Sequence, residues 1–241
     1  MNDSPTDYRD SHVGKGGSYD AALAAQPFDA YMARLEADYL REIVPQLVNG
    51  GGRYVDFACG TGRIIATVAP LVAESVGVDV SETMLAAARQ KCPSSRFVRA
   101  DLTRDPVDLG EFDLATSFRF LGNAEHTLRQ AALGAVSRLV RKGGHLIVNS
   151  HRNPHSIGAA VLALRGHVHG MDLTYWKLKR LLREHGFEVV RVRSIGVWLV
   201  RARMRTAAVL EARGAAPAER VFRHRMFAPI APDCVVVARK H

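Results

Sequence analysis

Apolar residues recur along the chain in two alternating patterns, one typical of helices and one typical of strands. In residues 29–48 they fall four positions apart, at Tyr31, Leu35, Tyr39, Ile43 and Leu47, which is the spacing of one helix face. Pro45 is expected to bend this helix or to end it early. The run Gly50-Gly51-Gly52 then separates it from the rest of the chain.

Short apolar runs and helical patterns alternate after this glycine run. Strands are expected at residues 54–58, 75–79, 96–99, 112–117, 145–149, 187–195 and 234–238. Helices are expected at residues 62–69, 82–91, 125–141, 175–185 and near 201–213. The pair Gly143-Gly144 is expected to cap the helix before it. The alternation predicts an α/β fold, with a mostly parallel sheet, helices on both faces and a ligand beyond the carboxyl ends of the strands.

Composition and charge narrow the class of protein. No run approaches the ~20 apolar residues of a membrane helix, and the polar N-terminus lacks a signal-peptide stretch. A cytoplasmic protein without a membrane segment is therefore expected. The three cysteines form no CxxC pair, which argues against a disulfide framework or a zinc site. Residues 1–150 carry a net charge of -2 and residues 151–241 a net charge of +11, so the second part is either an arginine-rich surface or a face for anionic partners.

A glycine-bearing turn follows the first expected strand, in Asp56-Phe57-Ala58-Cys59-Gly60-Thr61-Gly62. Its small residues let the backbone approach a ligand, and the amides of the next helix face an anionic group. Asp79 ends the second strand 19 residues after Gly60, where a carboxylate can accept hydrogen bonds from ribose. The third glycine of a dinucleotide motif and the P-loop pattern are both absent, which weakens the NAD and NTP interpretations.

On these residues the sequence resembles the class I S-adenosylmethionine-dependent methyltransferases. The turn at residues 56–62 matches the family's first motif, with Ala58 where the family often has glycine. Val76-Gly77-Val78-Asp79-Val80-Ser81 resembles the second motif, and Arg99-Ala100-Asp101-Leu102 the third. The resemblance implies a Rossmann-like sheet of seven strands with the last antiparallel, an inserted cap between strands 6 and 7, and S-adenosylmethionine as the cofactor.

The resemblance also implies the residues that hold this cofactor. Asp79 would bind the ribose, Val80 and Met84 would lie beside the adenine, and Asp101 would contact the adenine amino group. The expected cofactor contacts are Asp56, Ala58, Cys59, Gly60, Gly62, Asp79, Val80, Met84, Asp101, Leu102 and Phe118.

The acceptor side is expected in the segments that diverge from the family pattern. Residues 1–28 are interpreted as a flexible leader that can act as a lid, and residues 29–241 as a single domain with acceptor-site insertions at 151–172 and 196–230. The expected substrate contacts are Tyr19, Arg119 and Trp198, where Arg119 either holds an acidic substrate group or pairs with Glu125.

A hydroxyl acceptor usually needs a general base, and histidine suits this role near neutral pH. His126, His151 and His155 follow the fourth and fifth strands and are the candidates, each with an ordinary surface role as the alternative. The pair His167 and His169 is too sparse for a metal site, so no metal is expected.

Three functions remain open from the sequence. The first is a small-molecule methyltransferase, monomeric or homodimeric, that methylates a hydroxyl of a natural product or a sugar. The second is an RNA methyltransferase that uses the basic C-terminal half, with Trp198 and Phe222 available for stacking on bases. The third is a cofactor-binding partner without activity, because a fold does not determine a function.

Overall fold

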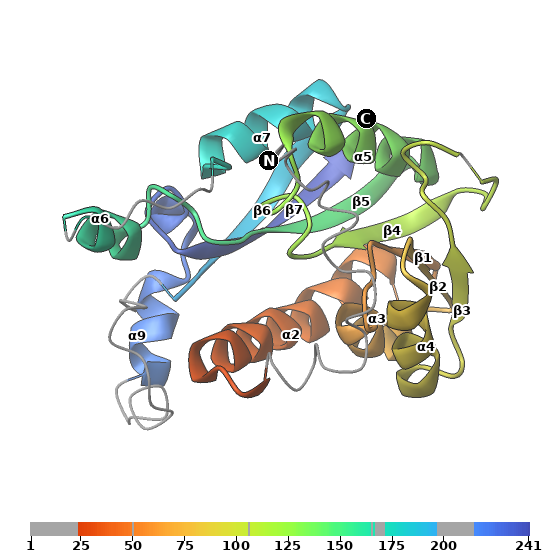
Figure 1. Cartoon of the computed structure of the whole chain (residues 1–241), viewed down its shortest axis with the longest axis horizontal. Helices are drawn as coiled ribbons and strands as arrows, with labels where there is room; N and C mark the ends of the chain where they lie inside the picture. Colours follow the sequence, from red (N-terminus) through yellow and green to blue (C-terminus); the bar gives the residue numbers. More distant parts are fainter. Residues whose placement is uncertain (1–23, 50, 106, 165, 167–171, 197–214) are drawn as a thin grey trace, which may run out of the picture.

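The computed structural model describes residues 24–49, 51–105, 107–164, 166, 172–196 and 215–241 (Figure 1). Within them, seven strands form one sheet in the order β3-β2-β1-β4-β5-β7-β6. The strands are β1 Arg53–Phe57, β2 Glu74–Asp79, β3 Arg96–Arg99, β4 Phe112–Ser117, β5 Val140–Ser150, β6 Phe187–Ile195 and β7 Asp233–Lys240.

Strand direction divides the sheet into two parts. β3, β2, β1, β4 and β5 pair in parallel, whereas β7 lies antiparallel to both β5 and β6. The expected sheet of seven strands with the last antiparallel is therefore confirmed. The strand order reverses between β1 and β4, and ligands of such sheets bind outside the carboxyl ends of the strands at this switch.

Helices cover both faces of the sheet, as expected (Figure 1). One face carries α2 Pro27–Val48, α3 Arg63–Val68, the short helix η2 Ala69–Leu71 and α4 Glu82–Lys91. The other face carries α5 His126–Leu139 and α7 Tyr175–Glu184. The remaining elements, α6 Ile157–Ala163, α9 Ala215–Phe222 and η4 Arg225–Phe227, lie beside the ends of β5 and β6.

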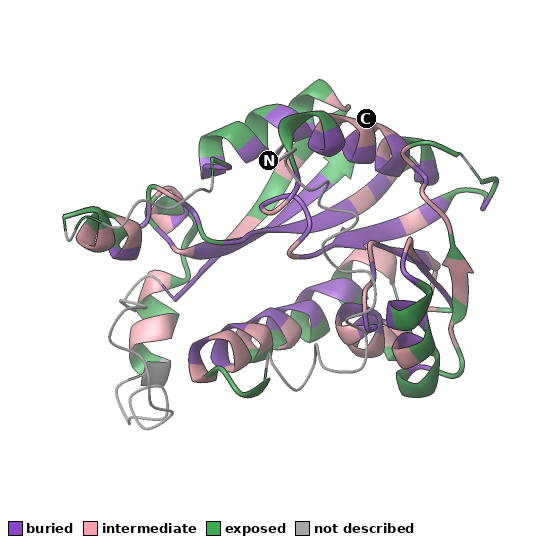
Figure 2. Cartoon of the chain, viewed as in Figure 1, coloured by how far each residue is buried: buried purple, intermediate pink, exposed green. Residues whose placement is uncertain are grey.

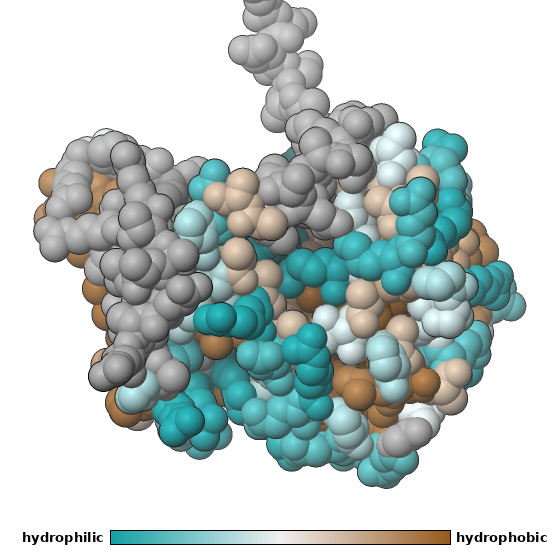
Figure 3. Space-filling model, turned by 90° about the horizontal axis from the view of Figure 1, so that it is seen from below, coloured by the Kyte–Doolittle hydropathy of each residue, from teal (hydrophilic) through white to brown (hydrophobic). Residues whose placement is uncertain are grey.

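Alternating side chains give the sheet a separate core on each face (Figure 2). Tyr54, Leu114 and Ile147 pack with α2, while Val55, Ala115 and Leu146, their neighbours along the strands, pack with α5 and α7. The outer side of the α2 face is mostly hydrophilic, with smaller apolar areas between the polar side chains (Figure 3). The helices therefore bury their apolar side and leave their polar side to water.

Proline and asparagine define the ends of α2. Pro27 occupies the first turn, where its missing N–H costs no hydrogen bond, and Asn49 ends the helix with a φ angle of 48°. The helix continues through Pro45 to Val48, so the expectation of an early end is wrong. Pro45 is exposed, and the buried stripe of α2 that ends just before it at Val44 packs in the core, which offsets the lost backbone bond.

The expected helix cap at Gly143-Gly144 is also wrong. α5 ends at Leu139, and the chain is already extended at Val140, which pairs with Phe112 of β4. Both glycines lie inside β5 at an irregularity of the β4–β5 ladder. A Cβ atom at Gly144 would lie 2.9 Å from Val140 and 3.0 Å from the backbone oxygen of Asp113, so close packing requires this glycine.

Several sequence-based expectations fall outside the described residues. These are the leader up to residue 23, the helix near 201–213, and the side chains of Tyr19, His167, His169 and Trp198. Phe28, at the end of the expected leader, is a buried residue of α2. In the part of the chain that the structure describes, no helix is long and apolar enough to span a membrane.

Candidate functional site

The turn between β1 and α3 leaves its backbone open at the carboxyl end of the sheet. Ala58, Gly60 and Gly62 have φ angles of 57°, 53° and 80°, so the chain turns sharply. A Cβ atom at Gly60 would meet no atom within 4 Å, whereas one at Gly62 would lie 3.0 Å from the Cβ of Ala88. Gly60 therefore keeps space free above the turn, and Gly62 lets α3 pack closely on α4.

Asp79 joins this turn to the end of β2. One carboxylate oxygen accepts a hydrogen bond from the backbone N–H of Gly60 at 2.8 Å, and the other accepts from Ser81 at 2.9 Å. Ser81 in turn caps α4 by accepting a hydrogen bond from the N–H of Met84. The carboxylate of Asp79 is thus held in one orientation at the edge of the sheet.

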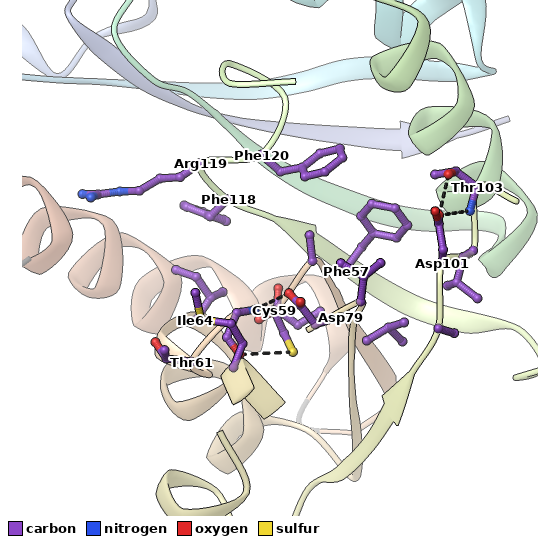
Figure 4. Close-up of a pocket in the computed structure, with 18 of the residues that line it drawn as sticks. Phe57, Cys59, Thr61, Ile64, Asp79, Asp101, Thr103, Phe118, Arg119 and Phe120 are labelled. Atoms are coloured by element: carbon purple, nitrogen blue, oxygen red, sulfur yellow. Dashed lines mark hydrogen bonds between the residues drawn. The ribbon is translucent and has the colours of Figure 1, made fainter. Parts of the chain in front are cut away.

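Asp101 occupies the equivalent place after β3. Its carboxylate accepts hydrogen bonds from the backbone N–H and the hydroxyl of Thr103, and its second oxygen lies 3.7 Å from the guanidinium of Arg104. Figure 4 shows Asp101 and Thr103 at one end of the pocket and Arg119 at the other.

These strand ends enclose one elongated pocket (Figure 4). Its floor is the glycine turn, Asp101 and Thr103 lie at one end, and Phe118 and Arg119 lie at the other. The lining residues are Asp56, Phe57, Ala58, Cys59, Gly60, Thr61, Arg63, Ile64, Val78, Asp79, Val80, Met84, Ala100, Asp101, Leu102, Thr103, Phe118, Arg119, Phe120 and Leu128.

Asp56 brings a buried carboxyl group to this pocket. Its Oδ1 accepts a hydrogen bond from the hydroxyl of Thr116 at 2.6 Å, and that hydroxyl also contacts the hydroxyl of Tyr54. The backbone N–H of Ile65 also acts on this carboxyl group, but within the described residues Oδ2 has no hydrogen bond of standard geometry. Burial raises the pKa of Asp56 to about 7, against the opposing effects of the Thr116 hydrogen bond and the Arg63 charge. The site therefore offers a buried acceptor that suits a cationic group.

A buried ion pair connects the pocket to α2. Glu36 is fully buried, and its carboxylate lies 2.9 Å from the guanidinium of Arg63. Its other oxygen accepts a hydrogen bond from the side-chain amide of Asn149, whose oxygen accepts the backbone N–H of Arg119 at 2.6 Å. Pocket residues from α3 and from the end of β4 are thus fixed by a single carboxylate on α2.

The candidate bases fall in different surroundings. His151 is buried directly after β5, and its Nδ1 lies 2.9 Å from the carboxylate of Asp233. His126 begins α5 and His155 precedes α6, and both are exposed. None of the three lines the described pocket. His151 lies two residues after Asn149, which accepts the backbone N–H of Arg119, and the charge of Arg119 acts on Asp233, the partner of His151.

Backbone strain gathers at the same edge of the sheet. Outside glycine, positive φ angles occur in the described residues at Asn49, Ala58, Arg119 and Arg152. The last three lie one or two residues beyond the ends of β1, β4 and β5, whereas Asn49 ends a helix. Strained residues of this kind persist where the surroundings hold them, and they cluster at functional sites.

Most of the expected cofactor contacts come together in the pocket. All of them line it except Gly62, which lies against Ala88 of α4. Arg119 also lines the pocket, and its guanidinium donates to the backbone oxygen of Asp29 at 3.4 Å. In the described residues no group of three or more His, Cys, Asp or Glu side chains is arranged to hold a metal ion.

The sequence reasoning missed several polar residues of this site, namely Glu36, Arg63, Thr116, Asn149 and Asp233. The alternation of side chains along strands could have indicated two of them, because Thr116 and Asn149 are polar residues at buried positions of otherwise apolar strands. Glu36 had a similar signal, since it falls within the apolar stripe of α2.

Comparisons with known proteins agree with this geometry. Residues 55–144 match the family model described as a methyltransferase domain. The magnesium protoporphyrin IX methyltransferase of Synechocystis PCC 6803, solved with bound S-adenosylhomocysteine, superposes with a TM-score of 0.67 at 17% identity, covering 97% of this chain and 98% of that chain. At this identity the likeness concerns the fold alone. The seven-stranded sheet has the Rossmann-like fold of the class I methyltransferases.

Curated relatives match the same region. A demethylmenaquinone methyltransferase of Beutenbergia cavernae is 35% identical over 104 residues, which are 43% of this chain and 42% of the relative. A ubiquinone biosynthesis O-methyltransferase of Methylococcus capsulatus is 27% identical over 165 residues, or 61% of this chain and 67% of the relative. The chain spans about half the length of the curated relatives it matches. These matches support the resemblance that the motifs carry, and residues 55–144 are the part that matches the methyltransferase-domain model.

Proposed function

We propose that this protein is an S-adenosylmethionine-dependent methyltransferase that methylates a hydroxyl group of a small molecule. The observation that carries the proposal is the row of three carboxylates, Asp56, Asp79 and Asp101, at or just beyond the ends of three neighbouring strands around one pocket. The three carboxylates would meet the three polar parts of the cofactor, which are the ammonium group, the ribose and the adenine.

The pocket residues fit the cofactor part by part. Asp79, oriented by two backbone amides, would accept hydrogen bonds from the ribose hydroxyls. Met84 and Leu102 would pack on the adenine beside Asp101. The buried Oδ2 of Asp56 would accept a hydrogen bond from the ammonium group of the cofactor. Arg63 would face the carboxylate of the cofactor. When bound, the cofactor supplies a methyl group activated by a positively charged sulfur.

The acceptor would enter at the end of the pocket where Arg119 lies. Phe120 packs edge to face on Phe57, with 5.5 Å between the ring centroids, and Phe118 borders the same end. Such rings favour a flat or apolar acceptor, and Arg119 would hold an acidic group on it. The curated relatives support a quinone-type ring as the acceptor class, and the ubiquinone biosynthesis enzyme among them is an O-methyltransferase.

The proposal is tested by binding and by methyl transfer. Isothermal titration calorimetry should show that S-adenosylhomocysteine binds the purified protein, and absence of binding would contradict the proposal. Methyl transfer from S-adenosylmethionine is then measured with catechol, hydroquinone, 3,4-dihydroxybenzoate and bulk tRNA. Transfer to a phenolic hydroxyl is expected, whereas transfer to tRNA alone, weakening steeply with salt, would favour an RNA methyltransferase.

Affinity for S-adenosylhomocysteine should rise with pH near neutrality. Burial places the pKa of Asp56 at about 7, so the free protein holds mostly the neutral acid below this pH. The ammonium group prefers the carboxylate, and its binding lowers that pKa, so affinity should increase about tenfold between about pH 6 and pH 8. Calorimetry measures this change. The Asp56→Asn variant, or 5'-methylthioadenosine as the ligand, should remove the dependence, and an unchanged dependence would exclude Asp56 as its source.

Two glycine variants should separate binding from packing. Gly60→Ala would project a methyl group into the pocket and is expected to weaken S-adenosylhomocysteine binding about tenfold, with a cost in stability of about 1–2 kcal/mol from its left-handed backbone. Gly62→Ala carries the same backbone cost and also forces its Cβ against Ala88, so its melting temperature should fall further. Calorimetry and thermal unfolding on both variants check this order. If both variants lose the same affinity for S-adenosylhomocysteine, the space above Gly60 does not contribute to binding.

A further inference from the structure

His151 and Asp233 lie side by side at the acceptor end of the α2 face. Ser150 of β5 pairs with Cys234 of antiparallel β7, so the next residues outward are His151 and Asp233. Alternation along β5 places His151 on the same face as Asn149, which binds Glu36 of α2. The two residues therefore stand in the polar layer that holds Arg119, beyond the end of the cofactor pocket.

The contact between them is short and enclosed. Nδ1 of His151 lies 2.9 Å from one oxygen of Asp233, and both side chains are less than 5% exposed. The other oxygen of Asp233 accepts the backbone N–H of Arg152 at 2.9 Å. Burial alone would raise the pKa of Asp233, but His151, the Arg152 amide and the charge of Arg119 hold it below its usual value. Asp233 is thus an ionised acceptor directed at Nδ1.

This arrangement determines which ring nitrogen of His151 is free to act. With Asp233 accepting from Nδ1–H, the neutral imidazole carries its lone pair on Nε2. Within the described residues the ring of His151 forms its hydrogen bond through Nδ1, to Asp233, so Nε2 can meet another partner. His126 and His155 are exposed at the surface and have no carboxylate partner among the described residues.

We propose that His151 is the general base for the acceptor hydroxyl and that Asp233 is the residue that positions it. This inference rests on the proposed methylation of a hydroxyl group and names the residues that would take up the proton of that hydroxyl. The acceptor O–H gives its proton to Nε2 of His151. The oxygen keeps the electron pair and bonds to the methyl carbon, while the carbon–sulfur bond breaks with its pair left on sulfur. The imidazolium, stabilised by Asp233, then releases the proton to water.

The Asp233→Asn variant tests the positioning role directly. One side-chain oxygen must still accept the Arg152 N–H, so the new amide NH₂ group would face Nδ1 and donate to it. The ring would then carry its proton on Nε2, which is the wrong tautomer for a base. Nitrogen-15 NMR of the histidine rings in the S-adenosylhomocysteine complex, assigned with His151→Gln, should show Nδ1–H in the wild type and Nε2–H in Asp233→Asn. An Nε2–H tautomer in the wild type would overturn the proposal.

Access to Nε2 is tested by chemical modification. Diethyl pyrocarbonate reacts with unprotonated imidazole nitrogens, and mass spectrometry locates the product. We expect His151 to be modified in the folded complex and the reaction to slow about tenfold in Asp233→Asn, while exposed His155 reacts equally in both proteins. If His155 is modified and His151 is not, no acceptor can reach Nε2 and the proposal is overturned.

Activity supplies the last comparison. With any phenolic acceptor that the wild type methylates, His151→Gln and Asp233→Asn should lower kcat by about 10²–10⁴, the usual contribution of a general base. His155→Gln should leave kcat unchanged, and the affinity for S-adenosylhomocysteine should stay within about threefold in all three variants. Retained kcat in His151→Gln overturns this inference, whereas a wild type that does not bind S-adenosylhomocysteine contradicts the proposed function instead.

Discussion

Replacing Asp79 by alanine is expected to abolish measurable binding of S-adenosylhomocysteine. The carboxylate would accept charge-assisted hydrogen bonds from ribose hydroxyls, each worth about 1.5–3 kcal/mol, so their loss alone weakens binding by at least about 100-fold. The variant also leaves the N–H groups of Gly60 and Ser81 without their acceptor, which loosens the glycine turn. Isothermal titration calorimetry measures the loss.

A matched aspartate controls for the change of charge. Asp108 is exposed and accepts the backbone N–H of Gly110, away from the pocket, so Asp108→Ala should bind S-adenosylhomocysteine like the wild type. Circular dichroism at the assay temperature shows whether Asp79→Ala remains folded. 5'-Methylthioadenosine, which retains the ribose, should also lose its binding. A folded Asp79→Ala variant with wild-type affinity would remove the basis for the ribose assignment.

Replacing Glu36 by alanine is expected to destabilise the protein by about 3–5 kcal/mol, the usual cost of breaking a buried ion pair on one side. Glu36 is fully buried, and its partner Arg63 is 22% exposed, so little water can replace the lost carboxylate. In the same variant the side-chain amide of Asn149 loses its acceptor. Asn149 is then less firmly positioned to accept the backbone N–H of Arg119. Equilibrium unfolding in urea measures the change, and S-adenosylhomocysteine affinity should fall with it.

The same helix offers a matched control. Glu42 of α2 forms an ion pair with Arg193, but its side chain is 50% exposed, and pairs of this kind contribute about 0–1 kcal/mol. Glu42→Ala should therefore change stability far less than Glu36→Ala. A double replacement of Glu36 and Arg63 by methionine should recover part of the loss, because no buried charge then lacks a partner. Equal effects of the two alanine variants would show that burial of Glu36 confers no special stability.

The cofactor end of the site could be predicted from sequence because its residues are defined locally. Asp79 and Asp101 each stand at the end of a recognisable strand, and parallel strands bring such ends to one edge of a sheet. Local patterns failed where packing decided the outcome. The glycine pair at 143 and 144 has the composition of a helix cap, yet the pairing of Val140 with Phe112 draws it into β5.

The acceptor end required the tertiary structure, because its partners are distant in sequence. The sequence offered His126, His151 and His155 as equivalent candidates for a base. Only the insertion of β7 beside β5 sets Asp233 against His151, 82 residues away, and leaves the other two exposed. Glu36 and Asn149, 113 residues apart, meet because α2 packs across the sheet.

The amino-acid sequence by itself therefore determined the order of the helices and strands and most of the residues that line the pocket, since strand ends, glycine turns and capping residues act over short distances. The tertiary structure alone decided which histidine is paired, which carboxylate is buried and which arginines are held in place. These properties depend on strand order and helix packing, which bring together groups that no local pattern relates.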